Sequence, residues 1–300
     1  MKTKLLRCIA YLLVAVIIFS GYQLWRINRN YAQEAAMHNH VLQFRPQISF
    51  ALPVQEDSTS QHASIHPDNL ANTDGSTQHD TAQLDGLIYL DGTAQHDSPA
   101  QQVAVPPSSN PATTSINQEV ADLRATYQSA VGWLAIPNTL IDYPFVQGTD
   151  NDFYLHMDLN HNRSQAGTVF MDYRNNSDFT DFNTIIFGHN MKNGSMFGTL
   201  QNFNSPEFFH NNRVGVVVLE NKKFVIEFFA FAVIKPNDPI IYNPSITSEV
   251  DKTAFLEYVQ NNARHYRDIA VTPENQVITL STCSYEFNNA RMVLIGRIVS

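Results

Sequence analysis

Cys283 is the residue of this sequence with the clearest chemical potential. The other cysteine, Cys8, lies in an apolar N-terminal run that predicts a membrane anchor, so Cys283 is the one thiol expected outside the membrane. A lone cysteine is more often a small buried apolar residue than a nucleophile. An unpaired thiol on an exported protein nevertheless favours a reactive role. With an ordinary pKa of about 8.5, the thiol needs a neighbouring base or cation to activate it.

Two further residues could provide that activation. His189 follows an apolar run in the segment Phe187-Gly-His-Asn190, and Arg291 begins another run after a loop of seven residues that follows Cys283. A hairpin would bring Arg291 beside the cysteine. His189 could then transfer the proton, while the permanently charged Arg291 could hold the substrate backbone or the developing oxyanion. A hydrogen-bonded turn histidine and an ion pair at a barrel edge are the structural alternatives for these two residues.

These residues must be positioned by strands of a domain that covers residues 119–300. Many short runs rich in Val, Ile and Phe, with helices inserted among them, predict a mainly β fold, a β-barrel with peripheral helices, rather than a parallel α/β sheet. Helices are expected at 117–131, from apolar residues spaced near 3.6, and at 248–267, from the capping pair Ser248 and Asp251. The expected strands are Thr168–Asp172, Thr184–Phe187, Val214–Leu219, Phe224–Val233, Val277–Leu280 and Met292–Ile298.

Residues 1–30 predict a transmembrane anchor with a short cytoplasmic tail. Residues 8–25 carry no charge, and a helix over them would be about 27 Å long, close to the ~30 Å hydrocarbon core of a bilayer. Basic residues precede the run, which favours a cytoplasmic N-terminus, a single pass through the cell membrane and an extracellular remainder. A cleaved signal peptide and a buried core helix are the alternatives, but no A-x-A pattern occurs between Ser20 and Met37.

Residues 31–118 are expected to form a disordered extracellular tether. The stretch from Pro46 to Leu123 contains no Lys or Arg and is rich in Ser, Thr, Gln, Asn, Asp and Pro. Such a segment buries too little apolar surface to offset its conformational entropy. By flexible-chain scaling it would span roughly 50 Å and extend the reach of the barrel from the membrane. The four histidines between Pro46 and Leu123 are irregularly spaced, so we expect no metal site there.

The formal net charge of −9 argues against a nucleic-acid-binding protein, which needs a basic surface. That value sums three unlike segments. Residues 1–45 carry 6 basic and 1 acidic residue, residues 46–118 carry 0 and 8, and residues 119–300 carry 13 and 19. Contact with an anionic membrane surface is therefore expected only at the N-terminal segment.

The residues around Cys283 resemble a known family, the sortases, which are cysteine transpeptidases of Gram-positive cell surfaces. The segment Thr279-Leu-Ser-Thr-Cys283 is similar to the family's TLxTC signature, and Arg291 is similar to the arginine that follows it. The resemblance covers about residues 119–300 and is closer to class B. The further segments that follow the class B pattern, in order, are Asp142-Tyr-Pro144, Val146-Gln-Gly148, Asp150-Asn151 with Tyr154-Leu155, Phe170-Met-Asp-Tyr-Arg174, and Gly188-His-Asn-Met191 with Met196-Phe197.

This resemblance implies a closed sortase-like β-barrel and a two-step acyl transfer. Cys283 would attack the Thr carbonyl of a C-terminal sorting signal, NPxTN-like or (S/N)PxTG-like, in a secreted protein. An amine of a cell-wall precursor or a pilin lysine would then resolve the thioester. His189 would exchange protons with the leaving and incoming amines, and Arg291 would position the peptide. The family's chemistry requires no cofactor and no metal.

Weaker candidates for substrate binding or support surround the main three residues. Asn151 resembles a class B residue near the site, and the backbone N–H of Ser284 is a candidate oxyanion donor. An acidic cluster at residues 150–158 lacks the EF-hand spacing, so a calcium site is not expected. The four weaker candidates are Asn151, Ser281, Thr282 and Ser284.

Two other functions share these residues or this architecture. A tethered thiol peptidase would use Cys283, His189 and Arg291 to release its substrate to water. A catalytically silent adhesin or scaffold would need none of them, and its Cys283 would resist alkylation. An assay with and without an amine acceptor separates the transpeptidase from the peptidase.

Overall fold

The computed structural model describes residues 2–50, 116–283 and 289–299, and it does not describe the side chains of residues 2–6, 8 and 283. Most of the expected tether therefore lies outside the described residues. The two ends of the chain that flank this segment belong to one compact unit, Met1–Val54 with Thr114–Ser300.

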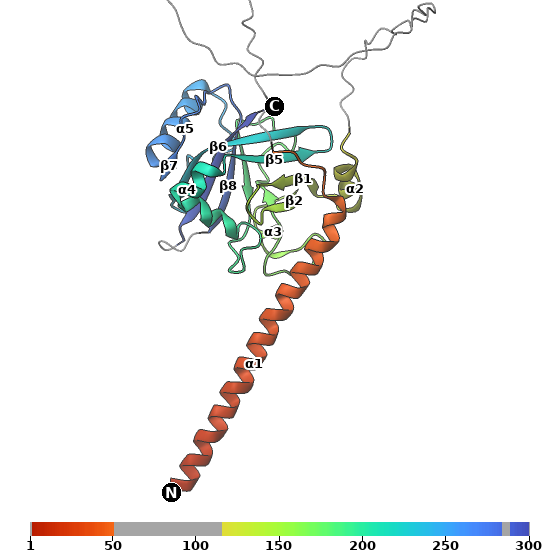
Figure 1. Cartoon of the computed structure of the whole chain (residues 1–300), viewed down its shortest axis with the longest axis vertical. Helices are drawn as coiled ribbons and strands as arrows, with labels where there is room; N and C mark the ends of the chain where they lie inside the picture. The colour runs from red at the N-terminus through yellow and green to blue at the C-terminus, as the bar shows by residue number, and fades with distance from the viewer. Residues whose placement is uncertain (1, 51–115, 284–288, 300) are drawn as a thin grey trace, which may run out of the picture. The chain divides into compact units, whose positions relative to one another are not determined.

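Eight strands close into a β-barrel, which confirms the expected fold class (Figure 1). They follow the order β5-β1-β2-β3-β4-β8-β9-β6, and pairing of β6 with β5 completes the ring. The short strand β7 also pairs with β6, on the edge opposite β9. The β2–β3 and β4–β8 pairs are parallel and the others antiparallel. The strands are β1 Ala130–Ala135, β2 Asp142–Gln147, β3 Phe170–Met171, β4 Asn183–Phe187, β5 Val214–Leu219, β6 Lys223–Ile234, β7 His265–Tyr266, β8 Val277–Cys283 and β9 Arg291–Val299.

The barrel interior is filled by large apolar side chains. In β8, Ile278 and Leu280 point into this core, whereas Val277 packs outside against the cluster that carries α5. In β6 a bulge between Phe228 and Ala230 shifts the alternation, so that Phe228 and Phe231 both face the interior. Because each of these side chains is almost fully buried, the core fixes the register of the strands that bear the candidate site.

Three strands, β1, β2 and β7, were not expected from the sequence, and a fourth, β3, is shorter than expected. The expected helix over 117–131 ends early: α2 covers Gln118–Thr126, and β1 begins at Ala130. Its apolar residues Val120 and Leu123 are buried as expected, but Val131 belongs to the barrel. The short β7 and the Pro-containing β2 were also missed, and β3 is only two residues long.

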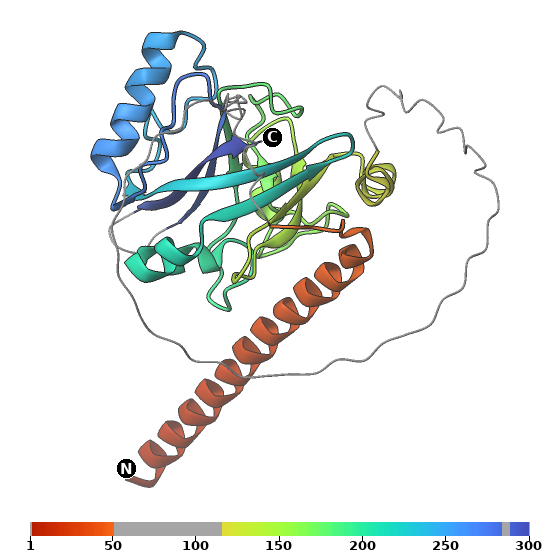
Figure 2. The ribbon, with the colours of Figure 1, turned by 45° about the horizontal axis from the view of Figure 1, so that its top comes forward.

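Helix α5 (Glu249–Asn262) lies between β6 and β8 in the chain and packs on the outside of the barrel (Figure 2). Ser248 caps it as expected, since its side chain accepts a hydrogen bond from the backbone N–H of Asp251. The helix stops before residue 263, because residues 265–266 pair with β6 as β7. Its buried face is Phe255 and Val259, whereas Val250, expected on that face, is 78% exposed.

The remaining short helices lie in the loops between strands. They are α3 Phe153–His156, η2 Gly198–Asn204 and α4 Pro206–Asn211.

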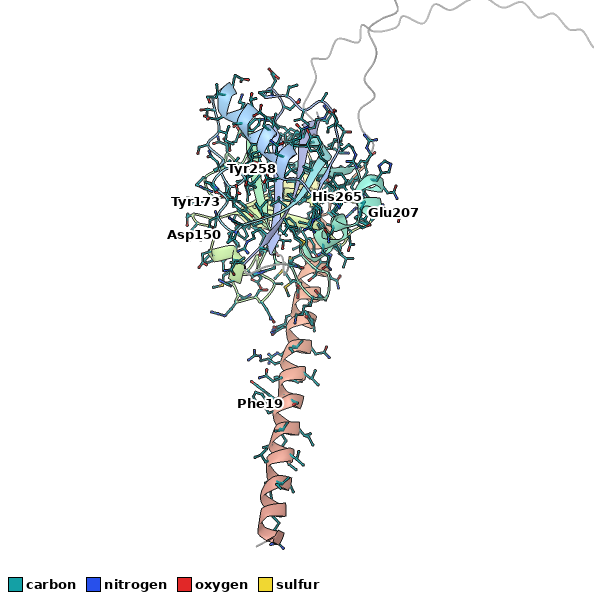
Figure 3. All side chains as sticks on the ribbon, turned by 90° about the vertical axis from the view of Figure 1, so that its left-hand side faces the viewer. Phe19, Asp150, Tyr173, Glu207, Tyr258 and His265 are labelled. Carbon is teal, nitrogen blue, oxygen red and sulfur yellow. The ribbon has the colours of Figure 1, made fainter. Side chains whose placement is uncertain are left out.

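Helix α1 covers Lys2–Val41 without a break. The apolar segment within Ile9–Phe44, of mean hydropathy 1.5, is long enough to cross a membrane, and none of it is buried inside the protein. The side chain of Phe19 projects from the helix away from other elements (Figure 3). The N-terminal helix is therefore a candidate membrane span, as its composition predicted.

The C-terminal end of α1 packs on the barrel, although residues 31–50 were expected to belong to the tether. Val41 is 2% exposed and shares an apolar cluster with α2 and β1. The short helix η1 (Leu42–Phe44) follows, and the Phe44 ring lies edge-on to Tyr127, 6.3 Å between centroids. The Arg45 side chain then forms an ion pair of 2.6 Å with Asp142. Apolar residues at 37–50, which composition averages obscured, explain this docking.

Candidate functional site

The backbone of Cys283 lies at the end of β8, between two neighbouring strands. On one side it pairs directly with Arg291, the first residue of β9. On the other side β8 runs parallel to β4, with Phe187 beside Ser281. Cys283 and His189 each lie two residues beyond that pair. Because adjacent strands are about 4.8 Å apart, the register brings the histidine and the arginine to opposite sides of the cysteine.

His189 is held by the backbone of the short helix α3. Its Nε2 lies 2.7 Å from the carbonyl oxygen of Leu155, and a carbonyl only accepts, so Nε2 carries the hydrogen. In the neutral ring Nδ1 therefore holds the lone pair. The alternative of a hydrogen-bonded turn histidine describes this contact correctly, but it leaves the second ring nitrogen available to a reacting group.

The environment of His189 disfavours its charged form. Burial lowers the pKa of the imidazole most, the hydrogen bond to Leu155 opposes this, and the nearby His156 lowers the pKa further. The two imidazole rings are 6.5 Å apart. We therefore expect His189 to be mainly neutral near pH 7, the state in which it can accept a proton.

Arg291 lies half-buried at the start of β9. Its Nη1 donates to the backbone carbonyl oxygens of Asn289, at 3.0 Å, and Ala290, at 3.3 Å. Among the described residues no carboxylate lies within ion-pair distance of it, so the barrel-edge ion pair considered above is not found there. These contacts orient the guanidinium group through the neighbouring backbone.

The weaker candidates are distributed differently. Ser281 is buried, and its hydroxyl lies 2.8 Å from the hydroxyl of Tyr242. Thr282 is also buried, and its Oγ1 has no hydrogen-bond partner among the described residues. Ser284 lies outside the described residues. Asn151 donates to Asp172 at 3.0 Å, so its side chain supports that carboxylate.

In the segment 150–158, acidic side chains accept hydrogen bonds from nearby backbone N–H groups. Asp150 accepts hydrogen bonds from the N–H groups of Asp152 and Phe153, which lowers its pKa, and Asp158 accepts from those of Asn160 and Asn162. In the parts of the chain that the structure describes, no three His, Cys, Asp or Glu side chains gather as metal ligands.

A cavity of about 590 Å³ lies elsewhere, between the C-terminal part of α1 and the barrel. Glu34, His38 and Tyr143 line it, but neither His189 nor Arg291 does. The candidate active site is placed by Cys283, His189 and Arg291, at the ends of β4, β8 and β9, and not by this cavity.

Comparison with known proteins decides the family. A family model described as the sortase domain matches residues 134–299, more than half of the chain. This chain belongs to the sortase family. Sortase B of Listeria monocytogenes is 36% identical over 196 residues, which cover 63% of this chain and 79% of that protein. Sortase B of Staphylococcus aureus is 26% identical over 188 residues, which cover 61% and 76%.

Solved structures agree with the class. Sortase B from Bacillus anthracis in complex with AAEK1 superposes with a TM-score of 0.57 at 32% identity, covering 62% of this chain and 86% of that one. Sortase B from Clostridium perfringens gives a TM-score of 0.57 at 31% identity, covering 60% and 99%. The chain is thus a class B sortase, and a cysteine transpeptidase by family, as the resemblance of its motifs implied.

Several residues of this sortase site were missed by sequence reasoning. Leu155 fell in a class B segment, but it acts through its backbone carbonyl, which any residue type could supply, so its role was not predicted. His156 sits in a helix of only four residues. Tyr242 lies in a loop without a recognisable motif. Arg174 did fall in a class B segment, but the segment alone suggested no role for it. Asp150 and Tyr173, near these residues in the sequence, lie on the same side of the barrel (Figure 3).

Proposed function

We propose that this sortase is a membrane-anchored transpeptidase that cleaves a sorting signal after Thr and transfers the acyl group to an amine. Cys283 is the nucleophile, His189 the proton carrier, and Arg291 the group that positions the peptide. The observation that carries the proposal is the register that puts His189 and Arg291 on the two sides of Cys283 at the ends of adjacent strands.

The first half-reaction forms a thioester. The Cys283 thiol first transfers its proton to Nδ1 of the neutral His189 imidazole, which gives a thiolate and an imidazolium. The thiolate attacks the Thr carbonyl carbon, a C–S bond forms, and the carbonyl oxygen becomes an oxyanion. Collapse of this intermediate breaks the C–N bond, and the leaving amine takes a proton from the His189 imidazolium. Arg291 offers a fixed positive charge for the oxyanion or for the peptide backbone before it.

The second half-reaction restores the enzyme. A neutral amine attacks the thioester carbonyl carbon, its proton passes to the His189 imidazole, and the C–S bond breaks to release the Cys283 thiolate. The new amide joins the substrate protein to the acceptor. The lowered pKa of His189 suits this step, because the imidazole must be neutral to accept the proton.

The substrates proposed are secreted proteins with an NPxTN-like or (S/N)PxTG-like signal, and the acceptor is an amine of a peptidoglycan precursor or a pilin. We further propose that α1 is a retained single-pass anchor with a cytoplasmic N-terminus, and that the catalytic domain comprises residues 119–300 outside the cell membrane. Helix length and hydropathy support the span.

The decisive experiment is a peptide-library screen with the full chain, with and without an amine acceptor. Acceptor-dependent formation of a new amide is expected, and release to water alone would indicate the thiol peptidase instead. Loss of turnover in Cys283→Ala, His189→Ala and Arg291→Ala is the companion result. Full activity of any of these variants would overturn the role given to that residue.

A further inference from the structure

We propose that Arg174 is a positioning residue of this enzyme, which with Asp172 holds Tyr242 across the strands that carry Cys283 and His189. The proposal rests on the proposed function of those two residues. It gives a role to the segment Phe170–Arg174, which the sequence analysis singled out without assigning it one.

We call the contacts of Arg174 with Asp172 and Tyr242 the brace. At one end of the brace is a buried carboxylate. Asp172 is fully buried and accepts hydrogen bonds from Arg174 Nε at 2.9 Å and Nη2 at 2.7 Å. The backbone N–H of Arg174 and Asn151 Nδ2 each add a further bond at 3.0 Å. Burial alone would raise the pKa of Asp172, but these hydrogen bonds outweigh it and lower the pKa. The bidentate geometry therefore fixes the plane of the guanidinium group.

The guanidinium group reaches from this carboxylate to the loop after β6. Arg174 Nη2 donates to the backbone carbonyl oxygen of Tyr242 at 3.1 Å. Asn183, in β4, also holds this loop, because its Nδ2 donates to the carbonyl oxygens of Ile241 at 2.9 Å and Asn243 at 3.2 Å. Three successive carbonyl groups of the loop are thus anchored.

The Tyr242 side chain links the two strands of the site. Its hydroxyl lies 2.8 Å from the hydroxyl of Ser281 in β8. Its ring stacks on Phe187 in β4, with centroids 5.9 Å apart and planes at 26°. Ser281 and Phe187 each precede a proposed catalytic residue by two positions, so this one side chain contacts both strands immediately before they deliver Cys283 and His189.

A purely structural ion pair is the competing interpretation, since the Arg174 side chain is 41% exposed. The two interpretations predict different activities for a variant with lysine in place of Arg174. An ammonium group can still neutralise Asp172, but it cannot present a planar fork to the carboxylate and a second N–H to the Tyr242 carbonyl together. A structural ion pair would be rescued by Arg174→Lys, and a brace would not.

The test compares full-length Arg174→Ala and Arg174→Lys with the unmodified chain. Arg124→Ala is the matched control, because it removes another ion pair, 3.0 Å to Glu220 on the surface. We expect kcat to fall at least about tenfold in both Arg174 variants, with a smaller change in KM, since slight misplacement of reacting groups is costly. The control should keep its kcat.

A second measurement does not depend on turnover. Iodoacetamide alkylation of Cys283, followed by mass spectrometry of its peptide across pH, should change in rate or pH midpoint in the Arg174 variants and not in Arg124→Ala. This readout separates the brace from the proposed function, which would itself fail if Cys283→Ala kept its transpeptidase activity.

If Arg174→Ala does not fold, Tyr242→Phe provides a second test of the proposal. This variant retains the ring and the backbone carbonyl and loses the hydroxyl contact to Ser281, so its kcat should also fall. Losses in Arg174→Lys and Tyr242→Phe should be less than additive, because both act through one contact chain. Unchanged kcat and alkylation in Arg174→Lys, or fully additive losses, would overturn the proposal.

Discussion

The ring of His189 is oriented by the backbone carbonyl of Leu155, with 2.7 Å between Nε2 and the oxygen. This hydrogen bond fixes the tautomer of the neutral ring and leaves Nδ1 for proton transfer. It also makes the short helix α3, whose sequence contains no obvious functional residue, part of the positioning of the proposed proton carrier.

Replacement of His156 should raise the pKa of His189. The neighbouring imidazole disfavours a second positive charge, so His156→Gln removes one cause of the lowered pKa, while burial remains. The His189 ring signal in an NMR titration should then move to a higher midpoint, and the acidic limb of the pH–rate profile should shift with it. His210→Gln, on α4, serves as the control, and an equal shift in both variants would contradict the explanation.

Acidification should destabilise the fold through the same residue. Because the folded-state pKa of His189 is lowered relative to the unfolded value, the unfolded chain binds the proton first as pH falls below about 6.5. Stability from this group is therefore full above that pH and declines as pH falls toward the folded-state pKa. The pH dependence of the melting temperature should be weaker in His189→Gln, if that variant folds.

Loss of Arg291 should slow the chemical steps more than it weakens substrate binding. If its guanidinium group stabilises developing oxyanion charge, Arg291→Ala should lower kcat by about 10²–10³-fold. Steady-state kinetics with a sorting-signal peptide measure this. A raised KM with unchanged kcat would instead restrict Arg291 to peptide binding.

Removal of the Glu227 carboxylate should lower the free energy of unfolding more than removal of most other charged side chains. It is 4% exposed and pairs with Arg213 at 3.0 Å and with Arg297 at 2.8 Å. Glu227→Ala leaves Arg213 and Arg297 without their partner, but their side chains are 50% and 27% exposed, so water solvates them in part. The cost should therefore be below the ~3–5 kcal/mol typical of a fully buried pair. Glu220→Ala breaks an exposed pair with Arg124 and should cost about 0–1 kcal/mol. Denaturant unfolding of the two variants gives the comparison, and equal losses would contradict it.

The sequence predicted the barrel better than it predicted its first strands. The run Val214–Leu219 is rich in valine, and it forms a strand with the expected bounds. The segment Ala130–Ala135 carries Ala, Gly and Trp instead, and its strand conformation depends on pairing with β2 and β5. Such pairing joins residues distant in sequence, which periodicity cannot detect.

The candidate site shows the same division. Cys283, His189 and Arg291 could be proposed from the sequence because their side chains have distinctive chemistry and lie at or just beyond the ends of recognisable strands. The supports could not, because Leu155 contributes only a carbonyl and Tyr242 becomes important only when its loop folds over β4 and β8. Arg174 showed a motif, but its partners became visible only in three dimensions.

The docking of residues 41–45 also changes how the acidic segment 51–115 is connected. The chain reaches the barrel at Val41 and Arg45 before that segment begins, and it resumes at α2, which packs beside η1 in the same apolar cluster. Helix α1 contacts the barrel even earlier, because Asn30 Nδ2 donates to Gln165 at 3.1 Å and the Ser195 hydroxyl donates to Glu34 at 2.7 Å. In the proposed membrane-anchored enzyme, the height of the site above the membrane is therefore set by the docked helix and not by the length of segment 51–115. Shortening that segment should leave this height unchanged, whereas inserting turns into the helix before Asn30 should alter which substrates the site can meet.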